Sequence, residues 1–329
     1  MASTADIFVE EEAFATWRVY LERLGPPKVP ITLPTPGEYP EVLSYLDVPE
    51  EDRGPIVASA PSLQANPELW WILQRAAWSL VSRMGDVDPP ATFVPVRDPR
   101  DPNHRYFFVH VCVATLPYVR AYFAQRCIPE TIGQASLADL GRNIRVHRKR
   151  YGVGGLGVAF WVMRHFRGTI YQLGRLQFER TRLGEGLASS MIDAGFDVRP
   201  EDLVLSIHIP DFMGPLSPEA CDQSIDMARA FFSRHFPEER YVAAVCHSWL
   251  LDPQLRAYLP PSSNIIRFQD RFHLGGGDYD ASTSVLQFVF GPVPSDLDEL
   301  PRRTTLERAI VTHLKAGGTW RGRSGWFSL

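Results

Sequence analysis

The sequence predicts a helical first half, followed by a second half in which short strands alternate with helices as in α/β and α+β proteins. Up to residue 150, apolar residues recur at helical spacing in segments that proline-rich connections separate. From Tyr151 onward, short β-rich or alternating runs are interleaved with helical ones. These two observations predict a helical N-terminal domain over residues 1–150 and a second domain over residues 151–329.

Four segments of the first half carry helical patterns. The clearest begins at Asn66, a good N-cap, because Pro67 follows at the first helical position and Glu68 places an acid in the first turn. The most apolar segment contains a histidine, a proline and an arginine, and it predicts a buried helix rather than a membrane span. The predicted helices cover residues 11–24, 66–85, 106–123 and 137–150, and a short strand is expected at 92–96.

The second half contains two capped helices among predicted strands. Ser217, Pro218 and Glu219 combine an N-cap, a first-turn proline and a first-turn acid, and they predict a helix that ends near His235. Asp252 similarly predicts a short helix to residue 259. Strands are expected at 169–182, 202–209, 241–246, 264–274 and 284–290, and the tail 317–329 is expected to be poorly ordered.

The composition is typical of a globular protein of a reducing compartment. The 329 residues carry 34 Lys and Arg against 38 Asp and Glu, and a net charge of -4 lacks the basic footprint of a nucleic-acid binder. The four cysteines form no C-x-x-C pair, which favours neither a zinc ribbon nor a disulfide scaffold. The N-terminus is acidic, unlike a secretory signal, and no apolar run reaches ~18 residues. We therefore expect a cytoplasmic protein without nucleic-acid, membrane or metal partners.

A glycine-rich segment from Gly152 to Gly157 matches the G-x-G-x-x-G pattern of dinucleotide sites. Such a site needs the glycines directly after a buried strand, where backbone amides and a helix N-terminus meet a pyrophosphate. The residues that precede these glycines, RVHRKRY, are too basic for a buried parallel strand. The pattern therefore favours a hinge between the domains over a dinucleotide site.

A strand, a loop and a capped helix follow one another between residues 203 and 236. His208 lies near the end of the strand, the loop contains Gly214, and Ser217 caps the helix. Unpaired amides and the helix dipole converge at such a junction, which can bind an anion. Most connections of this kind bind nothing, so the pattern alone does not establish a site.

A second histidine, His247, ends the next predicted strand beside Cys246. Side chains at adjacent strand ends can converge, and an imidazole with an unperturbed pKa near ~6.5 suits a general base. The alternative is a pair of packed core histidines. A thiol nucleophile at Cys246 cannot pair directly with His247, because neighbours on a strand face opposite sides. A metal site formed by His208, Cys246 and His273 is the other possibility, but their positions lack the usual ligand spacing.

Three polar residues, Arg175, Gln177 and Glu179, share one face of a predicted strand at a period of two. A sheet edge that faces solvent would also show this alternation. The functional interpretation has Glu179 accept a proton from an amine, directly or through water, while Arg175 pairs with Glu179 or with substrate.

Four motifs in one order resemble those of bacterial acyltransferase-like proteins, in which a helical N-acyltransferase domain precedes a GNAT-like C-terminal domain. They are GRLQFE at 174–179, HIP with GPLSPE at 208–210 and 214–219, CHSWLLDPQL at 246–255, and SNIIRF at 263–268. The resemblance implies an α+β fold, with a helical N-terminal domain and a GNAT-like mixed β-sheet domain flanked by helices. It also implies that an acyl-CoA lies between two splayed strands, near residues 203–209 and 241–247.

The donor-binding residues that the resemblance implies lie mostly in the loop after His208. They are Ile209, Pro210, Gly214, Leu216, Ser217 and Asn264. The usual GNAT pyrophosphate signature, Gln or Arg followed by x-x-G-x-G or x-x-G-x-A, is absent from residues 211–219. An acyl-pantetheine arm on an acyl-carrier protein would tolerate this loss, so both donors stay open.

The function that the resemblance implies is direct transfer of an acyl group from a thioester to the amine of a small molecule or peptide. A base takes the proton of the attacking nitrogen, while backbone amides polarise the thioester carbonyl. The expected general base is His208 or Glu179. The expected proton donor to the leaving thiolate is His247 or Ser248, with Tyr258 as a weaker candidate. The N-terminal domain is expected to cover the acceptor side. The alternative is a non-catalytic module of this fold that senses acyl-CoA or a protein partner.

Overall fold

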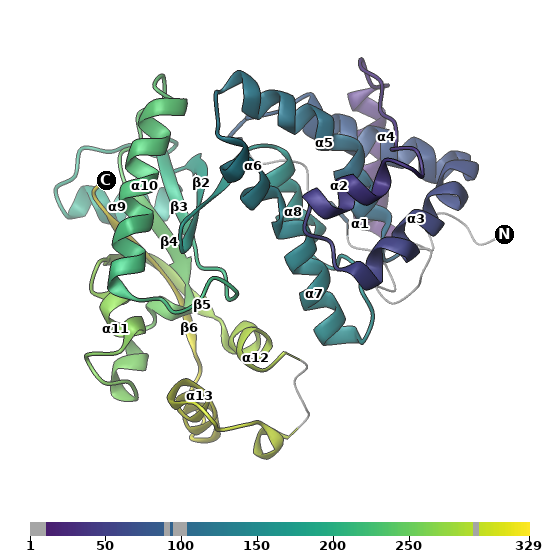
Figure 1. Cartoon of the computed structure of the whole chain (residues 1–329). Coiled ribbons are helices and arrows are strands. Elements are labelled where there is room, and N and C mark those ends of the chain that lie inside the picture. The colour runs from purple at the N-terminus through teal and green to yellow at the C-terminus, as the bar shows by residue number, and fades with distance from the viewer. Residues whose placement is uncertain (1–10, 89–92, 95–103, 292–295) are drawn as a thin grey trace. The chain divides into compact units, whose positions relative to one another are not determined.

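The computed structural model describes residues 11–88, 93–94, 104–291 and 296–329, which form two compact units, Met1–Tyr171 and Gln172–Leu329 (Figure 1). The strand that the sequence predicts at 92–96 falls largely outside the described residues. The first unit is helical in its described part. Its elements are α1 (Glu11–Leu24), α2 (Tyr39–Tyr45), α3 (Glu50–Ala65), α4 (Pro67–Val81), α5 (Phe107–Gln125), α6 (Glu130–Leu137), α7 (Asp139–Tyr151) and α8 (Ala159–Phe166).

Helix α5 forms the centre of the first unit. Every residue from Phe107 to Leu116 is buried, and the helix packs against α3, α4, α6 and α8. Its length and composition would suit a membrane span, but 67% of its most apolar window is buried inside the protein, as in a core helix. The sequence pattern does not predict α3, because Pro55 and Pro61 lie within that helix.

Helix α4 begins where the sequence predicts. The side chain of Asn66 accepts hydrogen bonds from the backbone nitrogens of Glu68 and Leu69, each at 3.1 Å. These bonds satisfy two of the amides that the first turn of a helix leaves unpaired. The cap is therefore a local interaction, visible in the sequence before any packing is known.

A buried histidine, His110, lies within α5. Its ring is 1% exposed, and its nitrogens lie 3.0 Å from the Tyr39 hydroxyl and 2.8 Å from the Ser59 hydroxyl. Burial lowers the pKa of His110 to about 4, because desolvation disfavours the charged ring. The ring is therefore neutral at pH 7 and hydrogen-bonded at both nitrogens.

The two units divide after Tyr171, about twenty residues later than the boundary that the sequence pattern suggests. The difference arises from α8, which packs against α5, α6 and α7 of the first unit. The glycines of 152–157 thus lie inside the first unit rather than at a hinge. Gly152 ends α7 in the left-handed conformation at a φ of 77°, and a Cβ on Gly154 would lie 1.7 Å from the Asp52 carboxylate.

The second unit contains a mixed six-stranded sheet in the order β1-β2-β3-β4-β6-β5. Strands β3 and β4 are parallel, whereas β2 with β3, β4 with β6, and β5 with β6 are antiparallel. The predicted strand at 169–182 is two strands, because Gly174 turns the chain at a φ of 67°. The strands are β1 (Ile170–Leu173), β2 (Leu176–Arg182), β3 (Leu203–His208), β4 (Ala244–Ser248), β5 (His273–Asp280) and β6 (Arg321–Phe327).

Helices α9 and α10 pack on this sheet, and η2 packs against β6. Helix α10 begins at the predicted Ser217 cap and packs against β2, lying along the strands in Figure 1. Helix α9 packs against β5, and its apolar residues form a cluster with Val204, Val245 and Trp326 of the sheet. The helices of the second unit are α9 (Glu185–Asp193), α10 (Pro218–His235), η2 (Trp249–Leu251), η3 (Pro253–Ala257), α11 (Asn264–Gln269), α12 (Ser282–Phe290), η4 (Leu297–Glu299) and α13 (Thr305–Lys315).

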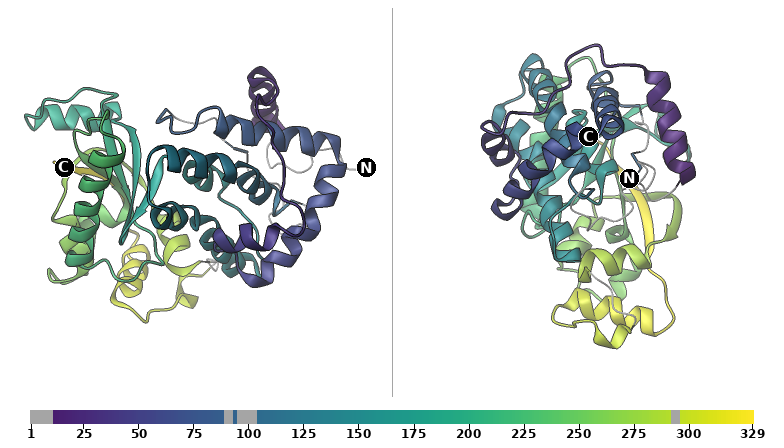
Figure 2. Two further views of the ribbon diagram at one scale, coloured as in Figure 1. Left: turned by 45° about the horizontal axis from the view of Figure 1, so that its top comes forward. Right: turned by 90° about the vertical axis from the view of Figure 1, so that its right-hand side faces the viewer.

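Three predictions for the second unit are wrong. Residues 264–269 are helical because the side chain of Ser263 caps them, accepting a bond from the Ile266 nitrogen at 3.3 Å. Residues 284–290 belong to α12, which packs beside α13 (Figure 2) and places Val285 in the cluster around Trp320. The tail is ordered as β6, between β4 and β5. In the last two cases, packing overrides a weak local preference.

Candidate active site

Polar side chains from four strands share one face of the sheet, beyond the point where β3 and β4 pair. The parallel register ends at Ile207 with Cys246, so His208 and His247 come next on their strands. Gln177 of β2 lies opposite His208, and Ser324 of β6 lies opposite His247. Because side chains of paired residues lie on the same face, these four groups form one row across the sheet.

Glu179 joins this row through a hydrogen bond. Its Oε2 lies 2.9 Å from Nε2 of His208, and the two side chains are 9% and 24% exposed respectively. An ionised carboxylate can only accept hydrogen bonds, so Nε2 carries the proton and Nδ1 is the basic nitrogen of the neutral ring. The carboxylate therefore orients the His208 ring.

His247 lies beside this pair and is held by Ser324, whose Oγ is 2.6 Å from His247 Nδ1. Burial lowers the pKa of His247, the positive charge that His208 can carry lowers it further, and Glu179 acts in the opposite direction. The residue as a whole is nevertheless exposed to solvent. A lowered pKa keeps His247 neutral at pH 7, so it can act as a hydrogen-bond donor or acceptor without carrying charge.

The other predicted catalytic residues lie away from this row. Ser248 follows His247 on β4, so its side chain faces the opposite side of the sheet, and its Oγ caps η2 by accepting a bond from the Leu250 nitrogen. The hydroxyl of Tyr258 lies 3.1 Å from His313 in a separate cluster. The geometry thus brings together three of the four predicted catalytic residues and does not support a role for Ser248.

Cys246 is also unsuited to nucleophilic chemistry. It is 1% exposed, and burial raises the pKa of its thiol to about 12, which disfavours the reactive thiolate. Across the described part of the chain, no group of three or more His, Cys, Asp or Glu side chains could hold a metal ion.

The loop between β3 and α10 contains most of the residues predicted to bind the donor. Ile209 and Pro210 directly follow His208, Gly214 adopts a φ of 76°, and Leu216 is buried before the cap. The side chain of Ser217 accepts a hydrogen bond from the Ala220 nitrogen at 3.3 Å.

Asn264 lies elsewhere in the second unit. It begins α11 directly after its cap, and α11 packs against α10. The structure therefore places five predicted donor residues in one loop beside His208 and the sixth on a neighbouring helix.

The sequence pattern misses one residue of the row, Ser324. This residue lies in the tail that the sequence predicts to be poorly ordered, 77 residues after His247. Serine in a short glycine-rich segment carries no signal of its own. Only the register of β4 with β6 shows that Ser324 faces the histidine.

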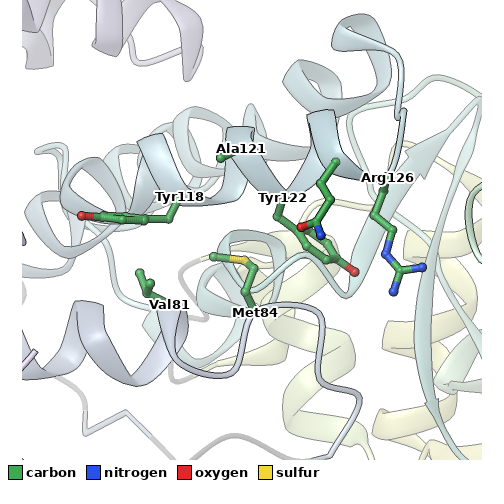
Figure 3. A pocket seen from close by; sticks show the side chains of 7 residues that line it. Val81, Met84, Tyr118, Ala121, Tyr122 and Arg126 are labelled. Carbon is green, nitrogen blue, oxygen red and sulfur yellow. The ribbon is translucent and has the colours of Figure 1, made fainter. Parts of the chain in front are cut away.

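The first unit contains a pocket of about 540 Å³ between the end of α4 and α5. In Figure 3, Val81 and Met84 lie on one side, Tyr118 and Tyr122 of α5 on the other, and Arg126 at one end. The lining thus combines aromatic and apolar surface with a cation. Such a lining suits an aromatic ligand with anionic or polar groups.

Comparison with known proteins agrees with the fold. Residues 37–168 match the N-acyltransferase N-terminal domain, and residues 170–327 match the GNAT-like C-terminal domain. A solved acyltransferase in complex with decanoyl-CoA and teicoplanin is 40% identical, covers 97% of this chain and 96% of its own, and gives a TM-score of 0.86.

Two further solved structures, an acyltransferase with CoA and 10C-teicoplanin and an acyltransferase mutant with octanoyl-CoA, match with the same values. No curated protein matches the chain. The identity extends over both units, and both domain models follow in the order that the motifs indicate. The chain therefore belongs to the N-acyltransferases in which this helical domain precedes a GNAT-like domain, enzymes that move an acyl group from a thioester to an amine.

Proposed function

We propose that this enzyme transfers a medium-length acyl group from acyl-CoA to an amine of a glycopeptide. The solved relatives support the substrate classes, since they bind octanoyl-CoA, decanoyl-CoA and teicoplanin and share 40% of their residues with this chain. Within the chain, the convergence of Glu179, His208 and His247 where the pairing of β3 with β4 ends carries the proposal. An acyl-carrier protein with the same thioester remains the alternative donor.

The row supplies the proton transfers that direct acyl transfer needs. The amine nitrogen attacks the thioester carbonyl carbon, forming a C–N bond, and one amine proton passes to His208 while Glu179 balances the new positive charge. The C–S bond then breaks, its electron pair goes to sulfur, and His208 returns the proton to the thiolate. The products are an amide and a free thiol, and the histidine is neutral again.

His247 acts in this scheme as an uncharged hydrogen-bond donor. The Ser324 hydroxyl can donate to Nδ1, which leaves the Nε2–H of His247 to stabilise negative charge on the thioester oxygen or the leaving sulfur. A neutral ring suits this role, because a permanent charge beside His208 would oppose protonation of the base.

The acceptor is proposed to bind the helical unit, in the pocket lined by Tyr118, Tyr122 and Arg126. Aromatic rings and a guanidinium offer stacking and ionic contacts to an aromatic peptide. Replacement of Tyr122 by Ala should raise KM for the acceptor and leave KM for the donor unchanged. The enzyme is proposed to work in the cytoplasm, and its four free cysteines suit a reducing compartment.

The decisive experiment incubates the purified full chain with octanoyl-CoA and a glycopeptide that carries a free amine. Thiol release and a product heavier by one octanoyl group would support the proposal, and both signals should disappear in the His208→Gln variant. Acetyl-CoA and octanoyl-pantetheine serve as donor controls. Thiol release that does not depend on the acceptor would indicate a thioesterase, and the absence of any product with every donor would reject acyl transfer to this acceptor class.

A further inference from the structure

Tyr122, which lines the pocket between α4 and α5, is held between two turns of glycine backbone. Gly85 follows α4 at a φ of 77°, and a Cβ there would lie 2.4 Å from the Tyr122 hydroxyl oxygen. Gly168 follows α8 at a φ of 72°, and a Cβ there would lie 2.7 Å from the Tyr122 ring. These two close contacts restrict the ring, so this wall of the pocket is in place before a ligand binds.

The two glycine turns are bonded to each other and to the segment after α4. The Gly85 nitrogen donates to the Arg167 carbonyl at 2.7 Å. The guanidinium of Arg167, a residue that is 2% exposed, donates to the Asp88 carbonyl at 2.7 Å. Asp86 closes the same segment, because it pairs with Arg83 at 2.8 Å and accepts a hydrogen bond from the Asp88 nitrogen at 2.9 Å. The turns therefore form one bonded unit that supports the tyrosine ring.

The lining of this pocket carries a positive charge. Among the described residues that line it, Arg126 is a cation and none is an aspartate or glutamate. The acids that follow Met84 in the chain are already engaged, since Asp86 and Asp88 lie 2.8 and 3.9 Å from Arg83. A ligand that brings a carboxylate into the pocket therefore meets a guanidinium, which binds carboxylates well, and no like charge from the described lining.

The guanidinium lies near the fixed ring. The Cζ of Arg126 is 5.8 Å from the centre of the Tyr122 ring, and Figure 3 shows the two side chains next to each other. This separation is similar to that between the ring centre and the carboxylate of an aromatic amino acid. A ligand ring that stacks on Tyr122 can therefore place its own carboxylate against Arg126.

We infer that the pocket selects acceptors in which an aromatic residue carries a free carboxylate, as at the C-terminus of a peptide. Tyr122 binds the ring by stacking, and Arg126 binds the carboxylate. The inference rests on the proposed function, which assigns the pocket to the acceptor, and it adds the chemical class that the pocket distinguishes. Arg126 is then a specificity-determining residue for the acceptor and takes no part in the proton transfers.

Calorimetric titration of the full chain, without donor, tests the inference with two probes: a glycopeptide that ends in an aromatic residue with a free carboxylate, and the same glycopeptide as its C-terminal amide. The variants are Arg126→Met, which removes the charge, and Arg126→Lys, which keeps the charge but loses the fork. Arg120→Met is the matched control, because Arg120 is an exposed arginine of α5 outside the pocket lining.

We expect the wild type to bind the acid about tenfold more tightly than the amide. Arg126→Met should bind both probes with the affinity that the wild type has for the amide. Arg126→Lys should be intermediate, and Arg120→Met should match the wild type. Tyr122→Leu should weaken the binding of both probes about 2- to 10-fold, because stacking is lost while the cation remains.

A purely structural arginine would give different results. If Arg126→Met loses the same factor of affinity for the acid and the amide, or keeps the preference of the wild type for the acid, Arg126 does not bind the carboxylate and the inference is overturned. Equal binding of both probes by the wild type, or binding of neither, would overturn it too. Failure of the proposed function appears separately, as acceptor binding with this preference but without acyl transfer once octanoyl-CoA is added.

Discussion

The hydrogen bond between Glu179 and His208 makes a quantitative prediction for a double-mutant cycle. The perturbations are Glu179→Gln and His208→Gln, alone and combined. The bond is 2.9 Å long and partly buried, and a charge-assisted bond of this kind contributes about 1.5–3 kcal/mol, or roughly 10- to 100-fold in rate. A general base contributes about 10²- to 10⁴-fold. We expect kcat to fall roughly 10- to 100-fold in Glu179→Gln and about 10²- to 10⁴-fold in His208→Gln.

The double variant should be no slower than His208→Gln alone, because Glu179 acts through the imidazole and has nothing to orient once the ring is gone. The assay is thiol release from octanoyl-CoA with saturating acceptor, with product mass as confirmation. Glu185→Gln, an exposed glutamate on α9, is the matched control. Thermal unfolding of each variant shows whether the fold survives.

Two results would refute this reasoning. If the losses of the single variants multiply in the double variant, the two residues act independently and the carboxylate does not work through His208. If Glu179→Gln is the slower single variant, the carboxylate itself takes the proton from the amine, and His208 is its partner. Wild-type activity of His208→Gln would show that this row of side chains takes no part in catalysis.

Three further predictions concern other parts of the chain. The pKa of His110 is 6.5 in the unfolded chain and about 4 in the native state. Between these two pH values the unfolded state binds more protons, so acidification favours unfolding. Urea titrations should therefore show a loss of about 2.5 kcal/mol between about pH 7.5 and 4.5 that is missing in His110→Gln, and equal slopes in both proteins would contradict it. Ser324→Ala should lower kcat about tenfold without changing KM for the donor, because His247 loses its orienting bond; Ser324→Thr should restore the rate, and a failure of this rescue would point to a structural role. Gly154→Ala should lower the free energy of unfolding by about 1–3 kcal/mol, because the new methyl group overlaps the Asp52 carboxylate. An unchanged melting temperature would show that the loop moves to accommodate the methyl group and would contradict the prediction.

The sequence indicates local features of this protein well. The Asn66 and Ser217 caps bond to amides two or three residues away, so the residues that form them stand together in the printed sequence. The strand over 203–208 is visible for the same reason, since four of its six residues are apolar. The order of four motifs was enough to indicate the fold and the reaction class.

Segments with weak local preferences could not be assigned from the sequence. The β-branched and aromatic residues of α12 favour a strand, yet their packing around Trp320 makes the segment helical. Helix α3 contains two prolines and has no clear apolar stripe, so its pattern resembles a connection. In these segments, tertiary contacts outweigh propensities of a fraction of a kcal/mol per residue.

The sequence by itself indicated which residues could carry chemistry, because Glu179 is a titratable group within a strand and His208 and His247 are titratable groups near strand ends. Only the tertiary structure decided which of them meet. Glu179 and His208 are 29 residues apart, and His247 and Ser324 are 77 apart. Strand register brings these pairs together and turns Ser248 away, because a shift of one residue moves every side chain to the other face. Register depends on the packing of the whole sheet, and no short segment of the sequence contains it.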